Sequence, residues 1–209
     1  MAAPDWQVTQ AGFDPQRQHH HETIFTIGNG YLATRGAFEE GYPQDRRATF
    51  IHGVFDAAPI VVTELANAPD WLALSVHVDG ERFGLDRGTV ETIERSVDLR
   101  AGVLARHVQW RSPQGRRLGL AFERFASLAQ PHLLYLRVRI VPEAGAKLEV
   151  RAALNGNVDN DGLLHWRHVD QAQALVLSFD PASSVTITAG GQQVQAGGPF
   201  PAVVPLEIP

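Results

Sequence analysis

The chain of 209 residues contains no cysteine and only a single methionine. Without cysteine, neither a disulfide framework nor a thiolate metal site can form. The longest apolar stretches fall well short of the roughly 20 residues that a membrane-spanning helix needs. The first ten residues, MAAPDWQVTQ, lack the charged and then apolar pattern of a secretory signal. From these absences we expect a cytoplasmic protein without a membrane partner.

The charge balance argues against a further class of partner. The chain has 18 Lys and Arg residues against 23 Asp and Glu residues, for a net charge of −5. No long basic stripe is present, so a nucleic-acid partner is not expected. Hydrophobic residues make up 44% of the chain, which is enough for a sizeable core. The length allows one large all-β domain or two small ones.

Alternation of apolar and polar residues dominates the chain after about residue 70, whereas residues 1–21 are polar and irregular. LLYLRVRIV and KLEVRAAL alternate cleanly, and WLALSVHV is followed by the hairpin signal Asp79-Gly80. ALVLSF and SVTITA add two further runs, while the final GGPFPAVVPLEIP contains no clear strand. Period-two runs are typical of half-buried strands, and no useful helical period is present. We therefore predict an all-β fold, an antiparallel β-sandwich with few or no helices.

The turn sequence SPQG predicts the register of the two strands beside it. If residues 113–115 form a three-residue hairpin loop, Ser112 pairs with Arg116. Such a loop commonly ends in a left-handed residue, so Gly115 should have a positive φ angle.

In this register two arginines enter an apolar face, because Arg106 faces Phe122 and Arg124 faces Leu104. An isolated buried charge costs several kcal/mol. We therefore expect Arg106 and Arg124 to form buried ion pairs, with an interface to another domain as the alternative. The candidate partners are Glu64, Glu94, Asp98 and Glu123.

The glycine-rich stretch ETIFTIGNGYLATRGAFEE raises the question of a phosphate-binding loop. Gly28, Gly30 and Ala33 fit a loose dinucleotide fingerprint, but that motif needs a helix after the glycines. The chain reaches Gly36 within six residues of Gly30, which leaves no room for one. Asn29-Gly30 instead favours a hairpin turn, with Gly28 and Gly36 easing close backbone packing.

Three other groupings have structural interpretations that outweigh the chemical ones. The adjacent histidines at residues 19–21 cannot easily face one ion, so a solvated loop is favoured over a metal site. NGNVDNDG, at residues 155–162, partly matches a calcium loop but has Asn160 where that loop needs glycine, so a turn is favoured. Glu39 and Glu40 are expected to be solvated or salt-bridged. We predict no metal site and no catalytic residue in this chain.

Several long motifs follow one another along the chain and cover most of residues 13–168. They are ETIFTIGNGYLATRGAFEE, TFIHGVFD, TELANAPDWLALSVHVDGERF, SVDLRAGVLARHVQW, SPQGRR, FERFASLA and ALNGNVDNDG. In this order they resemble glycoside hydrolase family 65, which includes maltose, trehalose and kojibiose phosphorylases and acid trehalases, and they leave the substrate open.

The resemblance implies that residues 1–209 are one N-terminal β-sandwich domain, a super-sandwich that stops before its last strands. In the family an (α/α)6-barrel, absent from this chain, carries the general acid and the phosphate site. The resemblance therefore implies a non-catalytic domain of a phosphorylase or hydrolase of trehalose, maltose or kojibiose. It implies no cofactor, with inorganic phosphate as a substrate of an intact phosphorylase. An unpaired sheet edge would also favour self-association, for instance as a homodimer.

Four residues are candidates for contact with a sugar or with the barrel: Arg35, His52, Asp56 and Trp71. An aromatic ring beside an acid suits carbohydrate, although a core position is favoured for Trp71 at the start of a strand. The alternative hypothesis is a stand-alone carbohydrate-binding or protein-interaction module. Reading the gene beyond Pro209 for a helical barrel would separate the two hypotheses.

Overall fold

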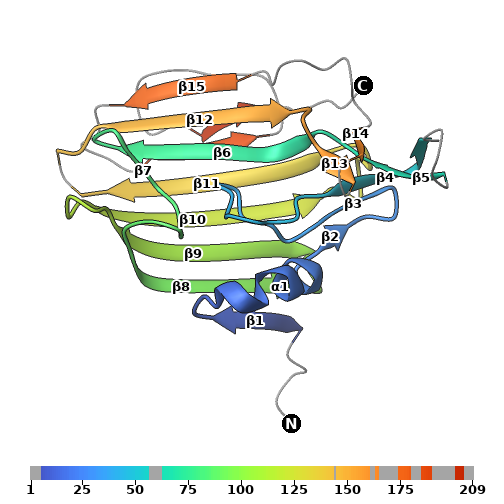
Figure 1. Cartoon of the computed structure of the whole chain (residues 1–209), viewed down its shortest axis with the longest axis horizontal. Coiled ribbons are helices and arrows are strands. Elements are labelled where there is room, and N and C mark those ends of the chain that lie inside the picture. The colour runs from blue at the N-terminus through green and yellow to red at the C-terminus, as the bar shows by residue number, and fades with distance from the viewer. Residues whose placement is uncertain are drawn as a thin grey trace, which may run out of the picture.

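The computed structural model describes residues 6–56, 63–143, 145–160, 163–164, 174–179, 185–189 and 201–204, with side chains described up to residue 160. Short helices lie near the N-terminus, and the rest is built from strands (Figure 1). In chain order the elements are β1 (Gln7–Ala11), η1 (Pro15–Arg17), α1 (Gln18–Ile24), β2 (Ile27–Gly28), β3 (Leu32–Thr34), β4 (Thr49–Asp56), β5 (Glu64–Asn67), β6 (Asp70–Val78), β7 (Glu81–Arg82), β8 (Thr89–Asp98), β9 (Val103–Arg111), β10 (Arg117–Ala126), β11 (Leu134–Pro142), β12 (Leu148–Asn155), β13 (Asp159–Asn160), β14 (Leu163–Leu164), β15 (Ala174–Phe179), β16 (Val185–Ala189) and β17 (Pro201–Val204).

The strands form two main sheets and two smaller ones. A seven-stranded sheet has the order β1-β8-β9-β10-β11-β16-β17, and a four-stranded sheet has the order β15-β12-β6-β7. A second four-stranded sheet, β2-β3-β4-β5, and the β13-β14 pair lie at one end of the molecule (Figure 1). Among the described pairs all are antiparallel except β16 with β17. The all-β antiparallel prediction is therefore confirmed.

The core lies between the two main sheets. The predicted alternation in β11 is confirmed, because its residues at 134, 136, 138 and 140 are buried and the intervening ones face outward. They share one apolar cluster with Leu74, Val76 and Val78 of β6 and with Leu148 and Val150 of β12. Side chains from both sheets therefore fill a single core, as a sandwich requires.

The β9–β10 hairpin has the predicted register. Gly115 has a φ of 93°, and the Ser112 amide donates to the Arg116 carbonyl over 2.8 Å. Arg106 pairs with Phe122, and Arg124 pairs with Leu104. The three-residue loop predicted from SPQG therefore correctly identified the two arginines that enter the core.

The glycine-rich stretch forms the β2–β3 hairpin rather than a phosphate loop. A Cβ on Gly36 would lie 2.7 Å from the Phe25 Cβ, and one on Gly28 would lie 2.8 Å from the Leu32 carbonyl oxygen. Both positions therefore require glycine because the backbone packs closely, as predicted.

Asn29 fastens this hairpin to the end of the large sheet. Its Nδ2 donates to the Ser127 carbonyl over 2.6 Å and to the Pro131 carbonyl over 2.9 Å. Its Oδ1 accepts the amides of Tyr31 and Leu32, each at 3.0 Å. One side chain therefore stabilises its own loop and holds it against the β10–β11 connection.

The N-terminal region is more regular than predicted. β1 pairs with β8, and the three histidines lie on α1 rather than in a loop. Asp14 caps the preceding turn by accepting the Gln16 amide, and Gln18 donates to Glu22 one helical turn away over 3.2 Å. Burial of this polar pair, not an apolar stripe, anchors the helix, so hydrophobic periodicity did not reveal it. At the other end of the chain, GGPFPAVVPLEIP contributes the strand β17, although we predicted no clear strand there.

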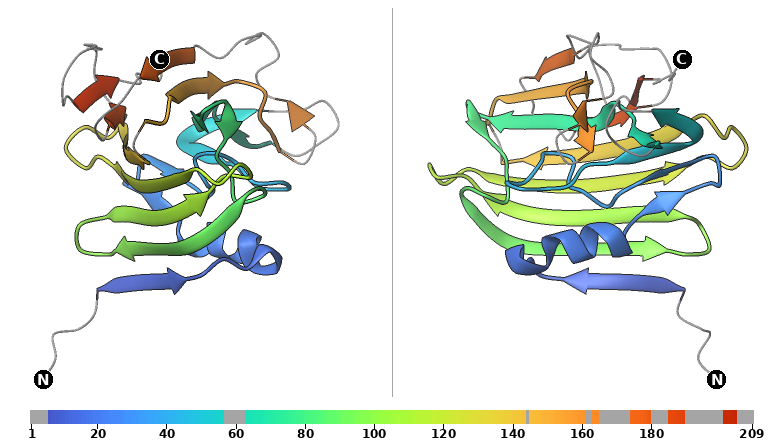
Figure 2. Two further views of the ribbon diagram at one scale, coloured as in Figure 1. Left: turned by 90° about the vertical axis from the view of Figure 1, so that its left-hand side faces the viewer. Right: turned by 45° about the vertical axis from the view of Figure 1, so that its right-hand side comes forward.

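α1 lies beside the β1 edge of the seven-stranded sheet (Figure 2). The segment after it packs Phe25 and Ile27 against Val97 of β8 and Leu104 of β9. Within the described part of the chain, no helix has the length and apolar character needed to cross a bilayer.

Candidate functional site

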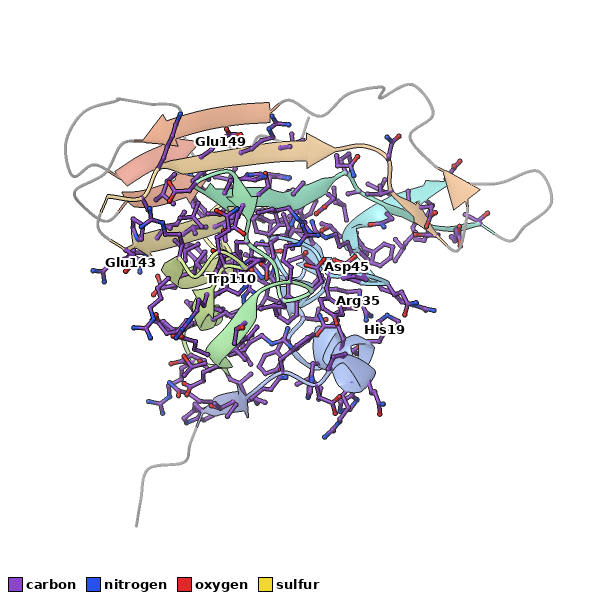
Figure 3. The ribbon with its side chains drawn as sticks, turned by 60° about the vertical axis from the view of Figure 1, so that its left-hand side comes forward. His19, Arg35, Asp45, Trp110, Glu143 and Glu149 are labelled. Carbon is purple, nitrogen blue, oxygen red and sulfur yellow. The ribbon has the colours of Figure 1, made fainter. Side chains whose placement is uncertain are left out.

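Two charged groupings dominate the described part of the molecule: a buried network around Arg106 and an open pocket beside Arg47. Trp110 lies inside the fold, whereas His19, Arg35 and Asp45 lie together on one side (Figure 3). The Arg35 Nη2 donates to the His19 carbonyl over 3.1 Å, which ties that side to α1.

Arg106, which is 2% exposed, is paired with two glutamates. Its Nη1 donates to Glu40 Oε1 and its Nη2 donates to Glu39 Oε2, each over 2.7 Å. Its guanidinium also lies over the rings of Phe38 and Phe122, at 4.6 and 4.1 Å from their centroids. This one side chain bridges two buried carboxylates and packs between two aromatic rings.

Two further arginines complete the buried network. Arg124 Nη1 lies 3.4 Å from Glu39 Oε1. Arg95 donates to the Gly36 carbonyl over 2.8 Å and to Gln10 Oε1 over 2.7 Å. The network therefore fixes the segment from Gly36 to Glu40 against β8, β9 and β10.

The pKa shifts follow from burial and from these neighbours. Burial acts to raise the pKa of Glu39, but Arg106 and Arg124 outweigh it and hold that pKa below its usual value. Burial acts to lower the pKa of Arg106, but Glu40 and Glu39 raise it overall. Arg95 is different, since burial and repulsion from Arg106 and Arg124 lower its pKa to about 9. The charges of Glu39 and Arg106 are thus mutually stabilised.

The identity of the carboxylates corrects the sequence prediction. Neither Glu39 nor Glu40 is among the four predicted partners, which were Glu64, Glu94, Asp98 and Glu123. Glu123 instead pairs with Arg137 on the exposed face of the large sheet. Residues 37–41 are not in a strand. Adjacent side chains can therefore turn toward the same guanidinium there. The available signal was the match between two inward-facing arginines and two adjacent glutamates flanked by glycines.

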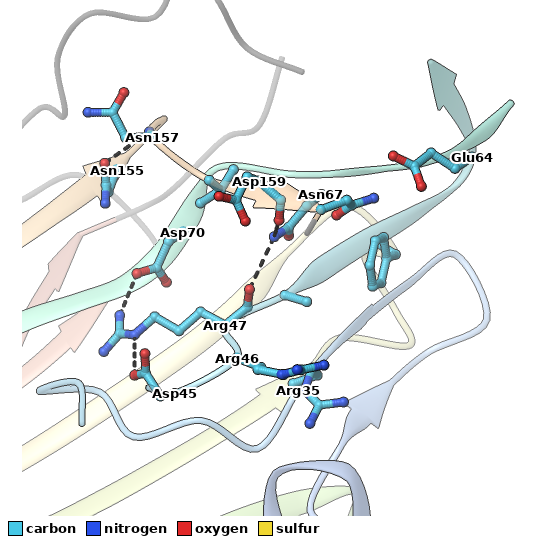
Figure 4. A pocket seen from close by; sticks show the side chains of 14 residues that line it. Arg35, Asp45, Arg46, Arg47, Glu64, Asn67, Asp70, Asn155, Asn157 and Asp159 are labelled. Carbon is cyan, nitrogen blue, oxygen red and sulfur yellow. Dashed lines mark hydrogen bonds and ion pairs between the residues drawn. The ribbon is translucent and has the colours of Figure 1, made fainter. Parts of the chain in front are cut away.

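The second grouping is an open pocket of about 510 Å³ (Figure 4). It lies between the connection before β4, the strands β4 and β5, and the segment around β13. Its lining residues are Arg35, Asp45, Arg46, Arg47, Ala48, Phe50, Glu64, Asn67, Asp70, Asn155, Asn157, Val158, Asp159 and Asn160. Hydrogen-bond donors and acceptors both line it, so it has the chemistry of a polar surface.

Arg47 holds one wall of this pocket together. Its Nε donates to Asp45 Oδ2 over 2.9 Å, and its Nη1 contacts Asp70 Oδ2. Its Nη2 reaches back to the carbonyls of Phe38 and Glu39, at 2.6 and 3.1 Å. Burial acts against this charge, but Asp70 and Asp45 raise the pKa of Arg47 above its usual value. Arg47 therefore links the pocket to the loop that carries the buried glutamates.

Asparagines hold the part of the pocket formed by β5 and β13. Asn67 Oδ1 accepts the Thr49 amide over 2.9 Å, and its Nδ2 donates to the carbonyls of Arg47 and Asp159 over 3.1 and 3.2 Å. Asn160 Nδ2 donates to the Leu65 carbonyl over 2.8 Å. These bonds join β5 to β13, so the pocket shape is set by the fold.

The four predicted contact residues are dispersed. Arg35 lines the pocket and pairs with Glu22 at 3.4 Å. His52 is exposed on β4, and Asp56 is the last residue of that strand. Trp71 is only 6% exposed and donates from Nε1 to Thr34 Oγ1 over 3.3 Å, so the core interpretation of Trp71 is confirmed.

Several pocket residues were not predicted from the sequence. Arg46, Arg47 and Asp45 come from the run QDRR, whose density of charge was the available signal. The turn at residues 155–160 is held by Asn155 Oδ1, which accepts the Asn157 amide over 3.0 Å. Residues 161–162 of that motif lie outside the described ranges. In the described part of the chain, no group of three or more acidic or histidine side chains is placed to hold a metal ion.

Comparisons with known proteins relate the chain to one family. The model of the glycosyl hydrolase family 65 N-terminal domain matches residues 8–194. The chain is 36% identical over 168 residues to a kojibiose phosphorylase of Halothermothrix orenii, and 32% identical over 172 residues to an α,α-trehalose phosphorylase of Thermoanaerobacter brockii. These alignments cover 80% and 75% of this chain but 22% of each relative.

A solved structure, described as a kojibiose phosphorylase candidate from the human microbiome, has the same fold. It superposes with a TM-score of 0.78 at 16% identity, covering 87% of this chain and 31% of that one. The chain thus spans about a fifth of the length of the curated relatives that it matches.

Proposed function

The chain belongs to the glycosyl hydrolase family 65 N-terminal domain family, and from this membership we propose that it is the non-catalytic domain of a disaccharide phosphorylase or hydrolase. The intact enzyme acts on an α-linked glucose disaccharide such as kojibiose, trehalose or maltose. The observation that carries the proposal is the match over residues 8–194 to a domain whose relatives are named kojibiose and trehalose phosphorylases. Those relatives are also several times longer, which favours a domain of a larger enzyme over a stand-alone module.

Glycoside cleavage needs an acid at the leaving oxygen and a nucleophile on the opposite face of the sugar. In an inverting phosphorylase inorganic phosphate is that nucleophile, so phosphate is a substrate and no cofactor is implied. We assign the acid to the helical barrel of the intact protein. The carboxylates of this chain support that assignment, because Glu39 and Glu40 are buried against Arg106, while Asp45 and Asp70 hold Arg47.

The complete product of the gene that encodes this sequence provides the test. It is incubated with kojibiose, trehalose or maltose, with and without phosphate, and glucose and glucose 1-phosphate are measured. A phosphorylase releases glucose 1-phosphate only when phosphate is present, whereas a hydrolase releases glucose in both cases. The 209-residue chain alone should release neither product.

Two results would contradict this proposal. One is turnover by the 209-residue chain that is lost in an Asp159→Asn variant of the pocket and retained in a Glu149→Gln variant outside it. The other is a complete gene product without a helical barrel, which would leave the stand-alone module as the better hypothesis.

A further inference from the structure

The strands β4 and β5 form an arm that extends at one end of the sandwich, away from the two main sheets (Figure 1). Near its tip Phe55 pairs with Leu65, and Asp56 pairs with Glu64. Phe55 is 59% exposed and Leu65 is 37% exposed. A large aromatic side chain opposite a leucine in solvent is an apolar surface without a covering element in the described part of the chain.

Other exposed groups gather at the same end. The β10–β11 connection lies there and carries Leu128, which is 83% exposed. The β2–β3 hairpin is held against that connection by Asn29. Tyr31 from the hairpin contacts His132 edge to face, with ring centroids 4.4 Å apart. We call this surface, made of the β4–β5 arm, the β2–β3 hairpin and the β10–β11 connection, the arm end.

The polar pocket continues from the arm. Phe50, Glu64 and Asn67 belong both to the arm and to the pocket lining, and Arg46 and Asn157 are exposed at the pocket itself. The arm end therefore carries exposed apolar side chains next to the arginine, asparagine and carboxylate groups of the pocket. Protein–protein interfaces combine both kinds of surface.

The last described strand runs toward the arm end. Val204 of β17 pairs with Ala189 of β16, which pairs with Leu136 near the start of β11. Leu134, the first residue of β11, follows the β10–β11 connection directly. β17 therefore ends at the side of the sandwich where the β10–β11 connection and the arm end lie.

We propose that the arm end is the surface on which this domain binds the catalytic part of its own parent polypeptide. The inference rests on the proposed function, and it places His52 and Asp56 at that interface, with Arg35 in the adjoining pocket, rather than on a sugar. About four fifths of the matched relatives lie outside the region that this chain covers, so a partner is present in the same molecule. The end of β17 lies on the same side of the sandwich as the arm end.

Amide hydrogen exchange on the parent protein and on the 209-residue chain tests this surface. In the parent, the amides of Val54, Phe55 and Leu65 should exchange about tenfold or more slowly than in the chain alone, since a covered segment opens less often. The turn amides of Gly80 and Gly115, at the opposite end of the sandwich, should exchange equally in both. Equal exchange at the arm end would overturn the inference.

Matched variants separate an interface from a change in folding. Phe55→Asp is compared with Val141→Asp, because Val141 is also exposed, at 45%, but lies on the outer face of β11. Both variants should leave the melting temperature of the 209-residue chain unchanged. In the parent, only Phe55→Asp should return the arm-end amides to the rates of the chain alone. Equal behaviour of the two variants in the parent would count against the proposal.

The failures of the two proposals are distinguishable on the same samples. Phosphorolysis or hydrolysis by the parent without protection of the arm end overturns this inference and leaves the proposed function. Protection without turnover overturns the proposed function and retains the interface. Protection of the isolated chain that rises with its own concentration, or with added disaccharide, would assign the arm end to a second copy or to a sugar and overturn the inference.

Discussion

An Arg106→Met variant tests the buried network, because methionine keeps an unbranched stem but cannot donate hydrogen bonds to Glu39 and Glu40. Removing one partner of a buried ion pair costs about 3–5 kcal/mol. Arg106 serves two carboxylates that are themselves buried, so the loss should lie near the upper value, about 5 kcal/mol. In a chain of this length each kcal/mol shifts the melting temperature by about 2–4 °C, so the midpoint should fall by about 10–20 °C.

Arg137→Met is the matched control for thermal and urea unfolding followed by circular dichroism. Arg137 pairs with Glu123, but their side chains are 57% and 37% exposed. Such a pair contributes about 0–1 kcal/mol, which corresponds to a shift of at most about 4 °C. Adding Glu39→Gln and Glu40→Gln to Arg106→Met should recover part of the loss, since neutral amides tolerate burial better than unpaired charges. A shift for Arg106→Met no larger than that of the control would refute the reasoning.

Two further predictions concern the loss of stability at low pH and the substitution of two glycines. Because the pKa of Glu39 is lowered in the fold, its contribution is complete above the unfolded value of 4.5 and is lost as pH falls through the lower folded value. The urea midpoint should therefore decrease below about pH 4.5 more steeply in the wild type than in Glu39→Gln, and equal slopes would contradict this. Gly36→Ala should cost about 1–3 kcal/mol by overpacking against Phe25, and Gly36→Asn should cost more. At Gly115, where the φ is positive and space is open, the order should reverse, with Asn tolerated better than Ala; the urea midpoints of the four variants check both orders.

The sandwich and its central register could be predicted because both depend on local patterns. Alternation in β11 determines which face is buried, and a three-residue loop between Ser112 and Arg116 sets every pair in β9 and β10. Once that register was known, the entry of Arg106 and Arg124 into the core followed. No information from distant parts of the chain was needed for these steps.

The partners of those arginines could not be predicted from local patterns. Glu39 and Glu40 lie in an irregular loop, and only the folded arrangement brings that loop over β9 and β10. The same limit applied to the pocket, where Asn67 of β5 bonds to Asp159 of β13 across 92 residues of sequence. Helix α1 was missed for another reason, because it buries the polar Gln18 and Glu22 rather than an apolar stripe.

The pairing of Glu39 and Glu40 with Arg106 also orders events on the ribosome. Glu39 leaves the peptidyl-transferase centre 67 residues before Arg106 does, and Glu40 leaves it 66 residues before. At about 5–20 residues per second the nascent chain carries these two carboxylates for about 3–13 s before their counter-charge is made. During that interval, burial of the two carboxylates would leave them without the charge of Arg106. Because Glu39 also lies beside Arg124, we expect the segment from Gly36 to Glu40 to reach its final packing only after β9 and β10 have been synthesised.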